Sequence, residues 1–126
     1  MKKLIVILGL MLLNIARADR WVEIGYKSYA DVYSYSTYTL QGAKYVSMWF
    51  KELNPGDWET INGKKIWFEL RKIKVNCNSK TLSVEATTAY DLKGNVIDSY
   101  QSYKTNFKDI PPETVGETKW KYMCAN

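Results

Sequence analysis

The chain has 126 residues, which is enough for one compact domain with its own core and too few for several. Its 18 lysines and arginines outnumber its 13 acidic residues, so the formal net charge is +5, and no histidine occurs anywhere. The lack of histidine removes the commonest general base and the commonest metal ligand, so we expect neither an enzyme nor a metal centre.

The first eighteen residues are typical of an export signal. A basic start at Lys2-Lys3 precedes an apolar run over 4–13, and Ala16-Arg17-Ala18 is a small-x-small cleavage site. We therefore expect residues 1–18 to be cleaved and residues 19–126 to form one mature domain, periplasmic or secreted, with display on the outer surface also open. The apolar run is too short to remain as a helix across a bilayer core of about 30 Å.

Cleavage changes the charge that a partner meets. It removes three basic residues and leaves fifteen against thirteen acidic ones, a net charge of about +2. Proteins that bind nucleic acid usually carry a concentrated basic footprint, so we do not expect nucleic acid as a partner.

The mature part alternates apolar and polar residues with the period of β-strands. The segment 44–53 is apolar on both faces, which is typical of a central strand covered on one side and partly on the other. Residues 54–65 are expected to form the longest irregular connection. We predict an antiparallel sheet with strands over residues 21–26, 31–35, 44–53, 66–77, 81–90 and 96–104.

The pattern changes after Pro111-Pro112. Thr114-Val115-Gly116-Glu117 matches a capping box, in which the threonine hydroxyl bonds the glutamate amide, so a helix is expected to begin there. Lys119 and Lys121 are expected near the C-terminal end of this helix, where they complement its dipole. The residues predicted to lie on its packing face are Gly116, Trp120, Met123 and Cys124.

Cys77 and Cys124 are the only cysteines, and both lie in the exported part. An oxidising compartment lets such a pair close, so we expect one disulfide, with two unpaired buried thiols as the alternative. The bridge would join the end of the fourth strand to the helix across 47 residues, a loop length for which chain entropy alone gives about 4 kcal/mol. The predicted fold class is α+β, an antiparallel sheet with one C-terminal helix held on a face by the disulfide.

Several segments carry a family pattern: Trp21-Val22-Glu23-Ile24-Gly25, Val46-Ser47-Met48-Trp49, Cys77, Asp91-Leu92-Lys93-Gly94-Asn95-Val96 and the tail from Pro112 to Cys124. They resemble the surface-adhesin protein E family of small exported bacterial proteins. The resemblance implies a curled, six-stranded antiparallel sheet whose C-terminal helix is disulfide-bonded to one face. It also implies a non-enzymatic binding role, since the namesake is an outer-membrane adhesin that engages host matrix and plasma proteins and has been linked to haem.

Two groups of residues are candidates for partner binding. Tyr33 and Tyr35 are expected to share a strand face, and exposed tyrosines supply contact area at low entropic cost. The alternative for both is the ordinary role of half-buried strand aromatics. Arg71, Lys72 and Lys74 belong to the densest basic cluster and could meet an acidic partner. The alternative for these three is a solvated strand face.

These observations favour an exported binding protein without catalysis, whose partner is a protein such as a host extracellular-matrix or plasma protein. Two other functions remain open. One is a periplasmic carrier of a small ligand such as haem, which a tyrosine phenolate can ligate. The other is a periplasmic inhibitor of an enzyme such as lysozyme. No resident cofactor is expected, and haem enters through the resemblance alone.

Overall fold

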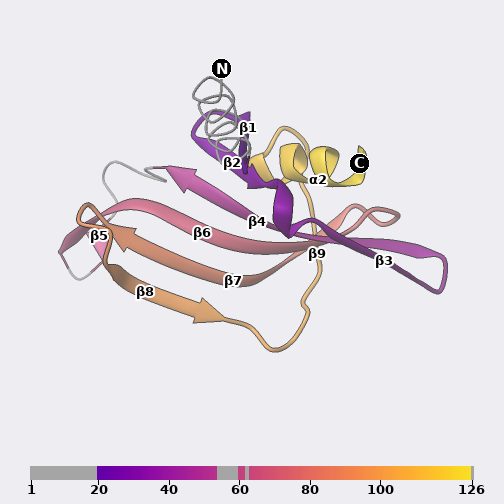
Figure 1. The fold of residues 1–126 in the computed structure, drawn as a ribbon. Helices are drawn as coiled ribbons and strands as arrows, with labels where there is room; N and C mark the ends of the chain where they lie inside the picture. The colour runs from indigo at the N-terminus through magenta and orange to yellow at the C-terminus, as the bar shows by residue number, and fades with distance from the viewer. Residues whose placement is uncertain (1–19, 54–59, 62, 126) are drawn as a thin grey trace, which may run out of the picture.

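One curled antiparallel sheet dominates the structure (Figure 1), a computed structural model that describes residues 20–53, 60–61 and 63–125. The expected signal peptide at 1–18 lies outside the described residues. The main path of the sheet runs β1-β2-β4-β6-β7-β8, and the short strands β3, β5 and β9 pair with β4, β6 and β7. The elements are β1 (Trp21–Gly25), β2 (Ser28–Asp31), the 3-10 turn η1 (Val32–Ser34), β3 (Ser36–Leu40), β4 (Ala43–Leu53), β5 (Thr60–Ile61), β6 (Lys64–Asn76), β7 (Thr81–Asp91), β8 (Val96–Gln101), β9 (Lys108–Asp109) and α2 (Val115–Ala125).

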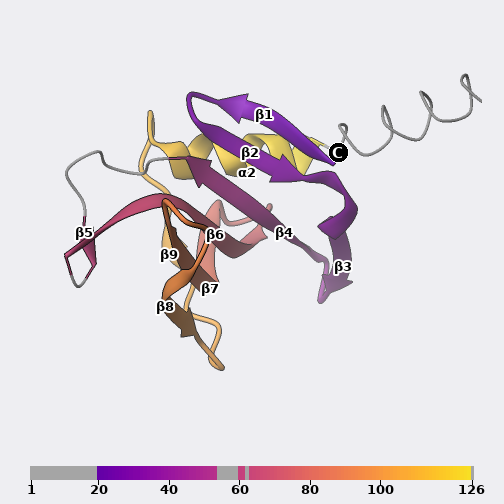
Figure 2. The same cartoon turned by 60° about the vertical axis from the view of Figure 1, so that its left-hand side comes forward.

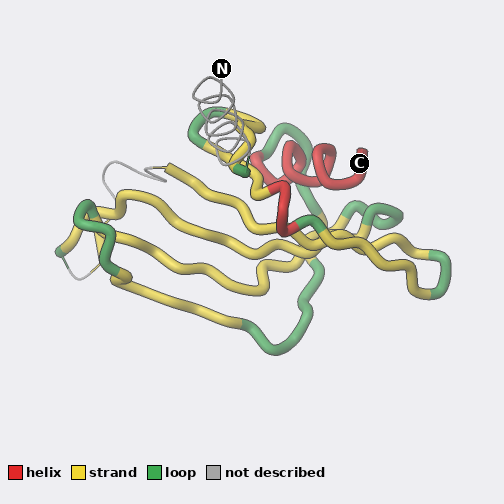
Figure 3. Tube along the Cα trace, viewed as in Figure 1, coloured by secondary structure: helices red, strands yellow, loops and turns green. Residues whose placement is uncertain are grey.

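The helix α2 lies on one side of the sheet, and the β1–β2 hairpin rises on the same side next to it (Figures 1 and 2). We call this side of β4, β6, β7 and β8 the helix face. The opposite side, on which no described helix packs, is the open face (Figure 3). The predicted α+β fold, with a curled antiparallel sheet and one C-terminal helix, is confirmed.

Strand alternation explains why the core lies on the helix face. In β4, Val46, Met48 and Phe50 are at most 1% exposed and pack in one cluster with Met123 of the helix. The residues between them point to the open face and are half-buried. The expectation that 44–53 is a central strand, covered on one side and partly on the other, is therefore confirmed.

The tail is clamped as the cysteine pattern predicts. Cys77 directly follows β6 and is bonded to Cys124 in the last turn of α2. The indole N–H of Trp120 donates a hydrogen bond to the carbonyl oxygen of Asn76 at 3.4 Å. Both contacts fix the helix to the same end of β6.

The predicted strand over 31–35 is wrong, because polar side chains fold these residues into a turn. The Asp31 carboxylate accepts a hydrogen bond from the Tyr33 amide at 3.1 Å. The Ser34 hydroxyl donates to the Asp31 carbonyl at 2.7 Å and accepts from the Trp49 amide at 2.8 Å. Residues 32–34 therefore form η1 between β2 and β3, and Tyr33 and Tyr35 do not share a strand face.

The other five predicted strands are present, with ends displaced by at most three residues. Of the predicted connection over 54–65, residues 54–59 and 62 lie outside the described residues. The remainder is not irregular, because β5 pairs antiparallel with the start of β6 at Lys64 and Lys65. Gly63 has a positive φ of 75°, which suits the tight turn between these strands.

The predicted helix cap is confirmed in its threonine half. The Thr114 hydroxyl accepts a hydrogen bond from the Glu117 amide at 3.2 Å. The Glu117 carboxylate reaches back to the Glu113 amide at 3.3 Å, one residue before the expected one, and also accepts from Lys80 Nζ at 2.6 Å. The hydrogen bond from Lys80 has the largest effect on the pKa of Glu117 and the one from the Glu113 amide the next largest. Together they lower this pKa from 4.5 to about 2.

This pKa predicts an acid-dependent contribution to stability. A carboxyl group whose pKa is lower in the folded state stabilises the fold above the unfolded pKa of 4.5 and loses that effect as pH falls through about 2. We expect Glu117→Gln to be less stable than the parent at pH 7 and nearly equal to it at pH 2. Urea midpoints of both proteins at the two pH values measure this, and a stability gap that does not change with pH would contradict it.

Lys119 was predicted near the C-terminal end of the helix, but it lies in the middle of α2, which has no basic residue in its last turn. It is only 4% exposed, because it lies on the side of α2 that packs against the sheet. Its ammonium group forms an ion pair with Glu52 of β4 and lies 5.2 Å from the centre of the Phe50 ring. Burial lowers the pKa of Lys119, and the Glu52 carboxylate opposes that shift. The helix thus places a charged group inside the helix–sheet interface.

Candidate functional site

A row of aligned side chains crosses the open face. Trp49 of β4 pairs with Lys72 of β6, Lys72 pairs with Ala86 of β7, and Ala86 pairs with Gln101 of β8. Directly opposed residues of antiparallel strands point to the same face of a sheet. These four side chains therefore project together, with small Ala86 between two long polar side chains and an indole at one end.

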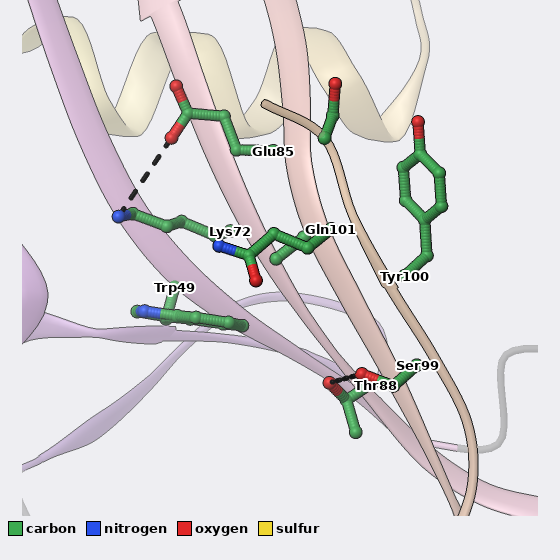
Figure 4. A pocket seen from close by; sticks show the side chains of 9 residues that line it. Trp49, Lys72, Glu85, Thr88, Ser99, Tyr100 and Gln101 are labelled. Carbon is green, nitrogen blue, oxygen red and sulfur yellow. Dashed lines mark hydrogen bonds and ion pairs between the residues drawn. The ribbon is translucent and has the colours of Figure 1, made fainter. Parts of the chain in front are cut away.

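A pocket of about 250 Å³ lies over this row and the next one. Thr88 and Ser99 form the neighbouring cross-strand pair, and their hydroxyls lie 3.4 Å apart. Figure 4 shows the Trp49 ring edge-on with Lys72 and Gln101 on one side of its plane. The hollow exists because Ala86, Thr88 and Ser99 are short side chains beside long ones.

An irregularity in β7 adds a carboxylate to the edge of this pocket. Lys72 pairs with Ala86 and Ile73 pairs with Val84, so Glu85 is the extra residue of a β-bulge. Its carboxylate lies 4.0 Å from Lys72 Nζ and 3.9 Å from Lys74 Nζ. Two ammonium groups thus share one carboxylate, so Lys72, Lys74 and Glu85 together keep an excess positive charge.

Aromatic rings flank the pocket toward β3. Tyr38 and Tyr45 are stacked with centroids 5.1 Å apart, and Phe107 lies 5.8 Å from Tyr45. Lys74 Nζ lies 4.9 Å from the centre of the Tyr38 ring, and the Lys74 side chain is only 18% exposed. Lys74 is therefore mostly covered by its neighbours, whereas the Lys72 side chain is 43% exposed.

A second aromatic group lies toward the other end of β4. Phe68 stacks on Tyr90 with centroids 4.5 Å apart, and Lys51 Nζ lies 4.6 Å from the Phe68 ring centre. The same ammonium lies 5.7 Å from the ring centre of Trp21. Aromatic rings and lysines therefore alternate along the open face on both sides of Trp49.

The structure divides the residues that the sequence suggested for partner binding. Lys72 and Lys74 lie together on the open face, but Arg71 is paired with Phe50 across β4 and β6 and points to the helix face. There its guanidinium donates to the Glu69 carboxylate at 2.8 and 3.1 Å. The period of two along a strand already separates neighbours such as Arg71 and Lys72, so this part could have been predicted.

The two tyrosines predicted to bind a partner also lie in different environments. Tyr33 lies in η1 and is 66% exposed, whereas Tyr35 is partly buried against the core cluster. Trp49, the central aromatic residue of the open face, was not among the residues predicted to bind a partner. Its signal was available in the predicted central strand, where Trp49 falls on the face opposite Met48 and Phe50.

Comparisons with known proteins agree with this architecture. The family model described as surface-adhesin protein E matches residues 21–125, which is nearly the whole described chain. No curated protein and no solved structure matches the chain. In the part of the chain that the structure describes, no helix is both long and apolar enough to cross a lipid bilayer.

Proposed function

The chain belongs to the surface-adhesin protein E family, and from this premise we propose that it is an exported, non-enzymatic protein that binds a host or envelope macromolecule through its open face. Family membership supports a surface-adhesin-like function at the level of the family. The favoured partner is a protein of the host, from the extracellular matrix or plasma.

The observation that carries the proposal is the half-buried Trp49 in register with the exposed Lys72 on a sheet face that no described helix covers. Binding hot spots are enriched in tryptophan and tyrosine that sit near the centre of a patch, surrounded by residues that exclude water. Trp49 has such a position, with ring groups on both sides of it. Lys72 adds a charge that speeds the encounter with an acidic surface.

Export rests on the leader at 1–18 and has its own test. Intact-mass analysis of the protein harvested from its native host is expected to show a chain that begins at Asp19 and has no free thiol. Fractionation of the same cells would separate display at the surface from a periplasmic or secreted location. A mass that includes residues 1–18 would contradict the proposed processing.

The binding role predicts a large effect of Trp49→Ala on affinity. Purified mature protein is passed over immobilised matrix and plasma proteins, and the dissociation constants of the bound partners are measured. We expect Trp49→Ala to weaken binding by at least about tenfold. Lys72→Glu is expected to slow association and to reduce its salt dependence.

The matched control is Lys121→Glu, the same charge reversal on the outer side of α2, where the lysine side chain is 68% exposed. It should leave binding unchanged. Tyr33→Ala and Arg71→Ala test whether the partner extends beyond the open face to the other predicted residues. Either an absence of binding to the whole panel, or binding that Trp49→Ala and Lys72→Glu leave unchanged, would refute the proposal.

A further inference from the structure

The pocket beside Trp49 has the size of a site for one small ring. Its volume of about 250 Å³ falls below the range of about 300–1,000 Å³ that is usual for pockets holding drug-sized ligands. Its floor is made by the short side chains of Ala86, Thr88 and Ser99, and its edges by longer ones (Figure 4). A single six-membered ring fits such a hollow better than a folded peptide segment.

Most of the lining residues are polar, and the Trp49 indole, Tyr100 and Ala86 add apolar surface. Trp49 supplies an indole, whose electron-rich face attracts polarised C–H groups. Gln101 can donate and accept hydrogen bonds, the Thr88 and Ser99 hydroxyls can do both, and Glu85 accepts. Thr88 and Ser99 already bond each other and Glu85 is shared by two lysines, but an apolar peptide side chain placed here would cover the Gln101 amide without offering it a hydrogen bond, which is unfavourable. A sugar ring can meet both the aromatic ring and the hydrogen-bonding groups, because it has a C–H face and hydroxyl groups around its rim.

The charge of the pocket restricts the class of sugar. Lys72 and Lys74 share the single carboxylate of Glu85, so these three groups together carry one excess positive charge. Lys74 is covered by Tyr38 and Tyr45, which leaves Lys72 as the ammonium that a ligand can reach. A carboxylate on the ligand would neutralise this charge through a charge-assisted hydrogen bond.

We propose that this pocket binds one carboxylated sugar ring, a sialic acid or a uronic acid, carried by the glycan of a macromolecule. The ring packs on Trp49, its carboxylate meets Lys72, and its hydroxyls bond Gln101, Thr88 and Ser99. This inference deepens the proposed function, on which it rests, because it names the chemistry that the open face recognises on its partner.

The test uses the mature disulfide-bonded protein and three defined oligosaccharides. Dissociation constants are measured by ligand-observed NMR for sialyllactose, for a glucuronate-containing hyaluronan tetrasaccharide and for neutral lactose. We expect one of the two acidic sugars to bind at least about tenfold more tightly than lactose, as one charge-assisted bond allows. Which acidic sugar binds identifies the source of the carboxylate. Binding of neither, or binding of lactose with equal affinity, would overturn the proposal.

Variants locate the site. Trp49→Ala and Lys72→Gln are each expected to weaken binding of the acidic sugar by about tenfold. Trp67→Ala, which removes an exposed tryptophan near the start of β6, and Lys121→Gln on the helix serve as controls and should have no effect. The Lys72 side chain is 43% exposed and lies outside the core, so Lys72→Gln stays informative even if Trp49→Ala proves unstable. Sugar binding that survives Lys72→Gln unchanged would place the ligand elsewhere and refute the assignment.

A last comparison separates this inference from the proposed function. Where a matrix or plasma protein binds the open face, its sialic and uronic acids are removed enzymatically and the binding is measured again. Loss of binding supports the sugar site. Undiminished binding that still depends on Trp49 refutes the sugar site and leaves the proposed function standing. If the pocket binds the sugar but no macromolecule binds the open face, the sugar site stands and the proposed function is refuted.

Discussion

Removing the disulfide is expected to lower the free energy of unfolding by about 4 kcal/mol, a large part of the total for a small domain. The Cys77–Cys124 bridge spans 47 residues of sequence, and closing a loop of that length restricts the unfolded chain strongly. The double variant Cys77→Ser/Cys124→Ser should therefore unfold at a much lower urea concentration than the parent. The helix should loosen first, because the bridge ties its last turn to the residue after β6. Without the bridge only non-covalent contacts remain there, among them the Trp120–Asn76 hydrogen bond and the packing of Trp120, Tyr122 and Met123.

Reduction of the parent supplies an independent comparison for this prediction. The parent in reducing agent should match the double variant, and reducing agent should have no effect on the double variant itself. Tryptophan emission, to which Trp120 contributes with four other tryptophans, follows the unfolding. A double variant within about 1 kcal/mol of the oxidised parent would show that the bridge is not what holds α2 on the sheet.

Replacing Lys119 by methionine is expected to destabilise the protein by about 3–5 kcal/mol, although methionine is apolar and of similar length. The Lys119 ammonium is the partner of the Glu52 carboxylate, which also accepts a hydrogen bond from the Ser28 hydroxyl at 3.2 Å. Glu69, itself 7% exposed, lies directly opposite Glu52 in the β4–β6 register. Without Lys119, Glu52 remains a poorly solvated charge beside a second carboxylate.

A second variant separates the loss of the partner from the loss of packing. In Lys119→Met/Glu52→Gln both charges are absent, so we expect most of the lost stability to return. Denaturant unfolding of the parent, the single variant and the double variant measures this cycle. The ion pair would have no stabilising role as described if Lys119→Met were as stable as the parent, or if the double variant were less stable than the single one.

Local pattern was sufficient for the long strands and the helix start. The segment from Lys44 to Leu53, apolar on both faces, marked the central strand, and Thr114 with Glu117 marked the first turn of α2. Both signals depend on residues a few positions apart, which any chain with that sequence brings together. The cysteine pair added one long-range contact, because an oxidising compartment leaves only one pairing for two cysteines.

The errors arose where distant residues compete with local pattern. The segment 31–35 alternates like a strand, but Asp31 pairs with Arg20 and caps the Tyr33 amide, and Ser34 bonds the Trp49 amide of β4. The Tyr33 amide is local, but Arg20 and Trp49 reach the segment only once β1, β2 and β4 are assembled. Lys119 was predicted to complement the helix dipole, and its burial was missed because its partner Glu52 is far away in the sequence.

The sequence by itself determined which segments extend, where the helix begins and which covalent bond holds it, because alternation, capping and cysteine number are properties that need no distant partner. Only the tertiary structure decided what the open face presents. The register of β4, β6, β7 and β8 aligns Trp49 with Lys72 and Gln101, and a bulge turns Glu85 toward the lysines. Register and bulges are set by how whole strands pack against one another, and a shift of one residue would send each of these side chains to the other face.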